Sequence, residues 1–502
     1  MPRFSLKYPY FIVVGCFIVS ILGIVSMMRL PVDLFPTIKI PVVAIATFYN
    51  GMPPEQIETT ITYRFERFFT LGSNIDHIES SSLPGVSLIK IYFQPGTNAD
   101  SAVSNIANLA MADLARLPVG TLPPIVLKFD ASSLPVCLVG LKAKNLNQAT
   151  IRDFGQFAIR DQLATVAGAS VPFPFGGKYR QIMVYVDPLK LEAYQLSAMD
   201  VVRTINDSNL ILPVGFAFLG QTYYNLFSNN QTTLEELNSI PLKTIGTSSA
   251  LVKDLGYAKD DAAIQTTIVL VDGKPSVYLP ILRQGGGSNT IAIVNGIKKV
   301  LSSLVDIPQQ LITQLFFDQS LYIRSSIKSL VFEGTLGLGL TALMILIFLG
   351  SFRATLASFF SIPLSVLGTF MILALGDNSI NVMILGGMAL AFSRLIDDSV
   401  VVLENIYRHL ELGEPPAIAA EKGAMEVSLP VLASTVTAGI VFLPVVLLYG
   451  VSKYLFSALA LSAVIALALS YIVAMTVVPL FCTTFLKQRI GPTFEKKGGS
   501  SI

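Results

Sequence analysis

The sequence predicts a membrane α-helical bundle of six spans joined to a large periplasmic α/β domain, and three observations support this fold class. The 502 residues are 52% hydrophobic and 14% charged, with a mean hydropathy of +0.63, which is too apolar for a soluble protein of this size. Six apolar runs are long enough to cross a bilayer. Between the first and second runs, about three hundred residues alternate between strand-like and helix-like patterns.

The first apolar run, Pro9–Met28, follows Arg3 and Lys7. It ends in Met-Met-Arg-Leu-Pro rather than in a small-residue cleavage site, so a retained span is predicted and not a signal peptide. After the large domain the remaining predicted spans are roughly Leu330–Leu349, Leu356–Leu375, Val382–Leu403, Leu429–Leu448 and Leu455–Phe485.

Lysine and arginine residues in the short connections predict the orientation. One side holds only Lys453, whereas the other side holds Arg3, Lys7, Arg353, Arg408, Lys422, Lys487 and Arg489. Because positive residues gather on the cytoplasmic side, both termini are predicted to be cytoplasmic. The large domain is then periplasmic, and the protein is expected in a bacterial inner membrane.

The large domain shows a repeated element order. Its first part follows β-α-β-β-α, with predicted elements at Val42–Phe48, Pro54–Leu71, Ile75–Ser81, Val86–Phe93 and Ala99–Leu117. The order begins again with Leu134–Lys142, Thr150–Ala167 and Gln181–Val186. Two ferredoxin-like split βαβ subdomains are therefore predicted.

The second copy is interrupted by an insertion at about residues 187–265, in which a helical Met199–Ser208 leads to Asn209–Gln221. This stretch is interpreted as an apolar loop without helical or strand periodicity, and insertions of this length usually make a contact or carry a function. Strand patterns resume only near Gln265–Leu270 and Ser276–Leu282, before a helical Ser288–Leu304.

Three charged residues, Arg394, Asp397 and Asp398, lie in the otherwise apolar stretch Asn381–His409. Each such side chain at a bilayer centre costs about 2.5–3.5 kcal/mol, so ion or proton traffic is the first interpretation. On a helix either aspartate lies within reach of Arg394, at i+3 or i+4. The alternative is a helix-terminal pair in the headgroup region. Thr435 or Thr437 is a further candidate donor to the aspartates.

Several classes of site are not expected. The three cysteines, Cys16, Cys137 and Cys482, have no metal spacing, and His77 and His409 are the only histidines, so neither a disulfide nor a metal site is predicted. No Walker A sequence and no Ser/His/Asp motif is recognised, so no enzyme, no cofactor and no nucleotide-driven step is expected. A net charge of +2 without a basic block gives no indication of a nucleic-acid partner.

Residues 351–409 resemble the third and fourth spans of resistance–nodulation–division (RND) efflux transporters. The residues that carry the resemblance are Arg353, Pro363, Gly368, Thr369, Ser379, Asn381, Asp397, Asp398, Glu404 and Asn405. It extends to Leu30-Pro-Val-Asp-Leu-Phe-Pro36, Tyr49-Asn-Gly-Met-Pro-Pro-Glu55 and Pro479-Leu-Phe-Cys482, and so covers nearly the whole chain.

The resemblance implies two porter subdomains with a docking subdomain inserted in the second. The boundaries are then 1–30 for the first span, 31–133 for the first porter subdomain, 134–186 and 266–325 for the second, 187–265 for the docking-like insertion, 326–488 for spans two to six and 489–502 for a cytoplasmic tail. It also implies a trimer, a periplasmic adaptor and an outer-membrane channel. The stretch Asn209–Gln221 matches a loop that contacts a neighbouring protomer, through Pro213, Phe216 and Phe218.

The resemblance implies that Asp397 and Asp398 form a proton relay. Two departures matter: RND transporters are typically twice this length, and a lysine from their second half completes the relay. Arg394 stands where many relatives have an apolar residue, and it either replaces that lysine or adds to a site that a partner chain completes.

The substrate is expected to be a drug-like or amphiphilic compound, because the metal-exporting branch tends to carry a single aspartate here. Phe93, Phe173 and Phe175 would suit an apolar substrate cleft, although core packing explains them equally well. Three functions remain open. The chain is a transport subunit that pairs with itself or with a second RND half, a truncated or accessory half-transporter, or an export factor similar to SecD. The last has this topology but carries an Asp-Leu-Arg-Gly-Gly stretch that is not found here.

Overall fold

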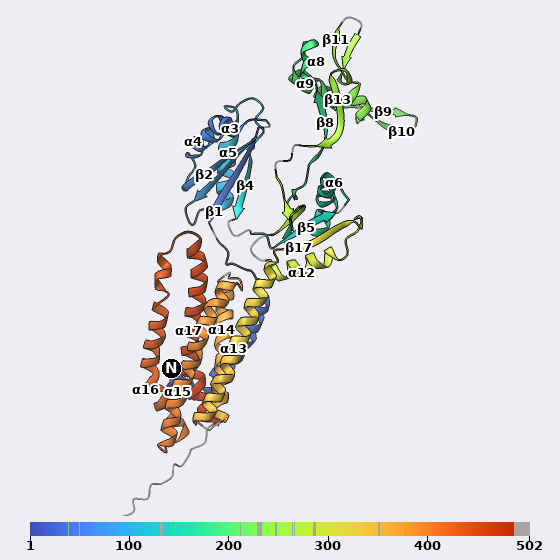
Figure 1. Cartoon of the computed structure of the whole chain (residues 1–502). Coiled ribbons are helices and arrows are strands. Elements are labelled where there is room, and N and C mark those ends of the chain that lie inside the picture. Colours follow the sequence, from blue (N-terminus) through green and yellow to red (C-terminus); the bar gives the residue numbers. More distant parts are fainter. Residues whose placement is uncertain are drawn as a thin grey trace, which may run out of the picture. The chain divides into compact units, whose positions relative to one another are not determined.

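A computed structural model of the chain (Figure 1) describes residues 1–485, except residues 39, 50, 131–133, 144, 211, 228–232, 246–247, 264, 266, 285–287, 350–351 and 377. Contacts divide the chain into two units. The first holds residues 1–136, 282–295 and the chain from 318 onward, and the second holds 137–281 and 296–317. Strand β16 (Val277–Arg283) and helix α12 (Thr290–Leu301) each cross a boundary between the units.

The first unit contains the long apolar helices. They are α2 (Pro9–Arg29), α13 (Gln319–Leu349), α14 (Phe352–Ala374), α15 (Val382–Glu411), α16 (Pro416–Ile440) and α17 (Gly450–Phe485), with α1 (Pro2–Lys7) before them and a short 3-10 turn, η3 (Leu443–Leu447), after α16. Among the described residues, four stretches are long and apolar enough to cross a membrane: Pro9–Arg29, Gln319–Phe348, Pro416–Leu447 and Gly450–Phe485. This confirms the membrane type of the chain. The remaining two predicted spans coincide with α14 and α15, so the number six stays a prediction.

Small residues let these helices approach closely. A Cβ atom added at Gly387 of α15 would clash with the carbonyl oxygen of Leu459 in α17. At Gly423 of α16 it would lie 2.8 Å from the Cα atom of Ile406 in α15. The core that these three helices share contains Val402, Leu403, Ile406, Ala420, Ala424, Ala474 and Met475. Helix α15 is therefore held on two sides.

The first unit also contains a four-stranded antiparallel sheet. Its strands are β1 (Pro41–Phe48), β2 (Ile75–Leu83), β3 (Val86–Phe93) and β4 (Ile125–Asp130), in the order β2-β3-β1-β4. The helical segments are α3, η1 and α4, which run without a break over residues 54–69, and α5 (Ala99–Leu114). Alternate residues of β1 and β3 face these helices, because side chains alternate across a strand, and they form the core with Phe65, Phe69 and Ile106. The predicted β-α-β-β-α order is present, and β4 follows it.

The second unit contains a five-stranded sheet, in the order β17-β5-β16-β6 with β7 paired to β16. These strands are β5 (Cys137–Ala143), β6 (Ala169–Ser170), β7 (Phe175–Gly176), β16 and β17 (Leu311–Phe316). The helical segments α6, η2 and α7 cover residues 148–164 without a break. The predicted repeat of the β-α start is therefore present.

One predicted strand belongs to another sheet. The strand at Gln181–Val186 exists as β8 (Arg180–Val186), but it pairs along its whole length with β13 (Gly256–Ala262) in a separate two-stranded sheet. Its assignment to the repeated sheet was wrong, because β13 satisfies its backbone groups and β6 takes the expected place beside β16. Around this pair lie α8 (Pro188–Ala193), α9 (Ala198–Ser208), α10 (Leu234–Asn238), β11 (Pro241–Ile245), β12 (Ser248–Leu251) and α11 (Val252–Leu255). A short hairpin of β14 (Leu270–Val271) and β15 (Lys274–Pro275) comes before β16.

The stretch Asn209–Gln221 is not an irregular loop. It contains β9 (Pro213–Leu219), which forms an antiparallel hairpin with β10 (Thr222–Phe227). The turn uses Gly220 at φ +66°, a backbone angle that glycine adopts without a steric penalty. The sequence signal was the position of the large residues Val214, Phe216 and Phe218 at every second place, which is the period of two typical of a strand.

Candidate functional site

Helix α15 carries the three charged residues predicted to form the site. It begins at the N-cap residue Asn381, whose side-chain oxygen accepts a hydrogen bond from the backbone N–H of Ile384 at 3.0 Å. From this fixed end the helix runs for 30 residues. Its rotation of about 100° per residue directs Asp397 and Asp398 to different sides, so the two carboxylates do not share one environment.

Asp397 and Arg394 form a pair on the outside of the bundle. Arg394 Nη1 lies 3.9 Å from Asp397 Oδ2, and the two side chains are 46% and 58% exposed in the protein alone. Arg394 Nη2 also donates to Ser434 Oγ of α16 at 3.1 Å. Of the two pairings that the spacing allows, the structure therefore has the i+3 pair.

Asp398 lies on the buried side of α15 and is 8% exposed. The Ser470 hydroxyl of α17 donates to Asp398 Oδ2 at 2.9 Å. Next to it, Ser399 Oγ lies 2.8 Å from Ser361 Oγ of α14. The buried carboxyl is thus held by a neutral hydroxyl between neighbouring helices.

Ser470 was not identified from the sequence, whereas Thr435 and Thr437 were. The two threonine hydroxyls donate to backbone carbonyls one turn earlier in their own helix, at Val431 and Ala433. A signal for Ser470 existed, because Ser462 precedes it by about two helical turns and therefore lies on the same face of α17. Ser462 Oγ donates to the carbonyl oxygen of Ile384 in α15 at 3.1 Å, so this face is directed at α15.

The aromatic candidates for substrate binding have different surroundings. Phe93 is 4% exposed and lies in the core of the first sheet, so core packing accounts for it. In the second unit, Phe173 and Phe175 are 58% and 47% exposed. The Arg160 guanidinium lies 5.0 Å from the Phe173 ring, and Phe175 stacks on Tyr278 at 5.3 Å. A substrate role for these two exposed rings stays a prediction.

The residues predicted to contact a neighbouring protomer lie on the β9–β10 hairpin, and all are exposed. They are Pro213, Phe216 and Phe218, and the two phenylalanine rings lie within 6 Å of each other and of Tyr223. A cluster of exposed rings is unusual on a surface that faces only water. The protomer contact stays a prediction.

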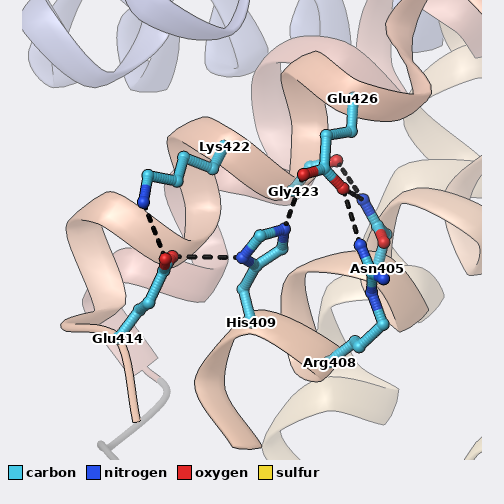
Figure 2. Close-up of polar contacts among 7 residues, drawn as sticks. All are labelled: Asn405, Arg408, His409, Glu414, Lys422, Gly423 and Glu426. Carbon is cyan, nitrogen blue, oxygen red and sulfur yellow. Dashed lines mark hydrogen bonds and ion pairs between the residues drawn. The ribbon is translucent and has the colours of Figure 1, made fainter. Parts of the chain in front are cut away.

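A second charged cluster lies at the C-terminal end of α15 (Figure 2). His409 is 6% exposed, and its Nδ1 and Nε2 atoms lie 3.1 Å from Glu414 Oε2 and 3.2 Å from Glu426 Oε1. Lys422 Nζ donates to Glu414, and Arg408 Nη2 donates to Glu426, both at 2.7 Å.

This cluster, named here the His409 cluster, consists of Asn405, Arg408, His409, Glu414, Lys422 and Glu426. The pKa of the Glu414 carboxyl lies below its usual range, first because Lys422 donates a hydrogen bond to it and further because of the nearby His409. No sequence pattern groups these residues, because their contacts depend on how the chain turns from α15 into α16.

The described residues provide no group of three or more His, Cys, Asp or Glu side chains that could hold a metal ion. Cys16 and Cys482 are free cysteines. The chemistry that this arrangement can perform is the binding and release of a proton at the buried carboxyl of Asp398, whose hydrogen bond comes from the neutral Ser470 hydroxyl.

Comparison with known proteins adds an independent observation. A family model described as "AcrB/AcrD/AcrF family" matches residues 1–497. Similar proteins include an "Uncharacterized transporter" of Haemophilus influenzae, 27% identical over 95% of this chain and 46% of that protein. "Multidrug resistance protein MdtC" of Photorhabdus laumondii is 28% identical over 95% of this chain, and that of Yersinia enterocolitica is 27% identical over 93%. The chain spans about half the length of these curated relatives, 46% in each case.

Proposed function

Because the chain belongs to the AcrB/AcrD/AcrF family, we propose that it acts in the proton-driven export of drug-like or amphiphilic compounds across a bacterial inner membrane. The observation that carries the proposal is Asp398, a buried titratable side chain in an apolar bundle with one neutral hydroxyl as its hydrogen-bond donor. The relatives whose names include "multidrug resistance" support the substrate class. A transport role, rather than an enzymatic one, is part of the proposal.

The proposal includes six spans, cytoplasmic termini and a periplasmic α/β domain. The long helices α14 and α15 at the two remaining apolar runs support the number six. Strand orders support two ferredoxin-like subdomains. In the sheet β2-β3-β1-β4, β4 lies beside β1, and β3 lies between β1 and β2. In the sheet β17-β5-β16-β6, β17 lies beside β5, and β16 lies between β5 and β6. The two sheets therefore share one strand arrangement, as expected for two split βαβ units.

In the proposed relay Asp398 takes up and releases the proton, and Asp397 with Arg394 forms a fixed pair beside it. Arg394 contacts Asp397 and Ser434, and its guanidinium keeps its charge throughout. This favours a cation supplied from outside these 502 residues over replacement of the family's lysine by Arg394. The partner is accordingly a second RND half, on the same or another chain.

The proposed assembly is a trimer or hetero-oligomer that works with a periplasmic adaptor and an outer-membrane channel. The exposed rings of Phe216 and Phe218 support a contact between protomers at the β9–β10 hairpin. The competing proposal is an accessory half-transporter that assembles but moves nothing.

Reconstituted vesicles with an imposed pH gradient test the proposal. The chain, with its second half where one is found, should export a fluorescent amphiphile, and the Asp397→Asn/Asp398→Asn variant should not, although it folds and assembles. Asparagine keeps the size and polarity of aspartate and removes titration. Full export by the double variant would contradict the relay, and no export by the unsubstituted assembly would favour the accessory role.

A further inference from the structure

The segment after the first span is fixed to the start of α15. Val32 forms a parallel bridge with Ile380, in which Ile380 N–H donates to Pro31 O at 2.8 Å and Asp33 N–H donates to Ile380 O at 2.9 Å. Val382 N–H, at the first residue of α15, donates to Leu34 O at 3.2 Å. Because α15 begins here, this segment and the N-terminal turn of α15 form one hydrogen-bonded structure.

The same segment is fixed to the start of α12. Thr290 is the first residue of α12, and its N–H donates to Val32 O at 2.9 Å. The Thr290 hydroxyl donates to Asp33 Oδ1 at 3.1 Å, and the Leu34 N–H donates to the same oxygen at 2.8 Å. Backbone and side chain therefore both join the segment to α12.

An ion pair completes the junction. Arg283, the last residue of β16, donates to Asp33 Oδ2. The two side chains are only 10% and 11% exposed, and burial lowers the pKa of the Arg283 guanidinium. A desolvated pair whose carboxylate also accepts two other hydrogen bonds has little freedom to rearrange, because every alternative leaves a buried charge unpaired.

We propose that Asp33 and Arg283 are positioning residues of a coupling joint that makes the start of α15 move together with the end of β16 and the start of α12. Helix α15 carries Asp398 about four and a half turns further along, and an α-helix transmits displacement along its axis as a nearly rigid rod. A change of state at Asp398 thus reaches β16 and α12 through Asp33. The transport consequence of this joint rests on the proposed function, whereas the mechanical link does not.

The alternative is a pair that only stabilises the fold. It would explain the burial and the hydrogen bonds equally well, and it predicts no response of α12 to a change within α15. The two roles therefore separate in an experiment that measures such a response and needs no transport.

The reporter for this experiment is a cysteine at Ala292, an exposed residue of α12, in a chain whose Cys16, Cys137 and Cys482 are replaced by alanine. The rate of maleimide labelling is measured in native membranes, with and without Asp398→Asn. With the joint intact, Asp398→Asn should change the labelling rate several-fold. In Asp33→Asn and in Arg283→Gln the same change should have no effect on that rate.

Two controls keep the result specific. Asp100→Asn makes the same chemical change in an exposed pair with Lys128, outside the joint, and should leave the response intact. A cysteine at Met111, exposed on α5, reports general loosening and should label equally in all variants. Should Arg283→Gln fail to fold, Thr290→Val removes one hydroxyl and leaves the ion pair, and it should reduce the response.

The proposal is overturned if the response at position 292 is unchanged in both Asp33→Asn and Arg283→Gln, or if it is absent while the joint is intact. Flux in vesicles then separates this result from the proposed function. In Arg283→Gln, proton uptake should persist without substrate export. Absence of proton uptake in the unsubstituted assembly would contradict the proposed function and leave the labelling result standing.

Discussion

Two titratable residues of α15, Asp398 and His409, are buried to a similar degree, but their hydrogen-bond and ion-pair partners differ in kind. Near the middle of the helix, Asp398 receives a hydrogen bond from the neutral hydroxyl of Ser470. At the end of the helix, His409 lies between Glu414 and Glu426, and each of these carboxylates also meets a lysine or an arginine.

The difference separates a group that holds a structure together from a group that can change state. In the His409 cluster every carboxylate has a cation, so a change of protonation would break contacts that are already satisfied. At Asp398 the protein supplies a hydroxyl, which can accompany either protonation state of a carboxyl group. A charged cluster with full compensation thus points to structure, and a buried charge with sparse compensation points to function.

The largest effect is expected when the two aspartates are substituted one at a time. Asp398→Asn alone should reduce export in reconstituted vesicles to background, because it removes the buried titratable group. Asp397→Asn should retain measurable export, since Asp397 is on the outer side and pairs with Arg394. Equal losses in both variants would mean that the two carboxylates act as a unit and that burial does not distinguish them.

At the other end of α15, His409→Leu should act on stability and not on transport. It removes the hydrogen bond between the His409 imidazole and Glu414, and a lost hydrogen bond of this kind costs roughly 0.5–1.5 kcal/mol. Thermal inactivation in detergent should show the loss, while the export rate per folded molecule stays unchanged. If the variant were stable but exported nothing, the His409 cluster would take part in transport, and the contrast with Asp398 would not hold.

Ser470→Ala should have a smaller effect, on transport. The lost hydrogen bond is worth about 1 kcal/mol, which corresponds to roughly a fivefold change in rate if it is made in the limiting step. Ser462→Ala is the matched control, because Ser462 lies on the same face of α17 and donates to a backbone carbonyl of α15. The pH profile of export should shift for Ser470→Ala only. If the two alanine variants had the same pH profile of export, Ser470 would contribute only to packing.

Much of the fold could be predicted from local patterns. Strand β3 occupies the predicted Val86–Phe93, and α5 ends at Leu114 instead of Leu117. Helix α13 begins at Gln319, eleven residues before the predicted Leu330, because a helix continues beyond the apolar run that marks its membrane part. These features depend on residues that are close in sequence, so the hydrophobic periodicity of the sequence predicts them.

The parts that could not be predicted depend on residues far apart in the chain. Asp398 and Ser470 are 72 positions apart, and Asp33 and Arg283 are 250 apart, so no spacing rule joins them. The pairing of β8 with β13 was missed for the same reason. The β9 strand is a different case. Large and small residues alternate in its sequence, but both faces of the strand are apolar, so no alternation of polar and apolar residues marked it as a strand.

The smallest expected effect is a pH dependence within the His409 cluster. The pKa of Glu414 is lowered from the ordinary value of 4.5, mainly by the hydrogen bond from Lys422. A carboxyl with a lowered pKa in the folded protein contributes stability that is present above its ordinary value and is lost as the pH falls through the folded value. Glu414→Gln should therefore inactivate at a lower temperature than the unsubstituted protein at neutral pH. The difference should begin to shrink below about pH 4.5 and disappear once the pH has fallen below the lowered pKa of the folded protein.

Glu421→Gln is the control for this prediction, because Glu421 pairs with Arg3 of α1, which lies outside the cluster. It should not reproduce the convergence at acid pH. A difference between Glu414→Gln and the unsubstituted protein that stays constant from neutral to acid pH would mean that glutamine loses shape or packing rather than charge. In that case the cluster would be held by geometry alone, and the contrast with Asp398 would no longer be one of electrostatic compensation.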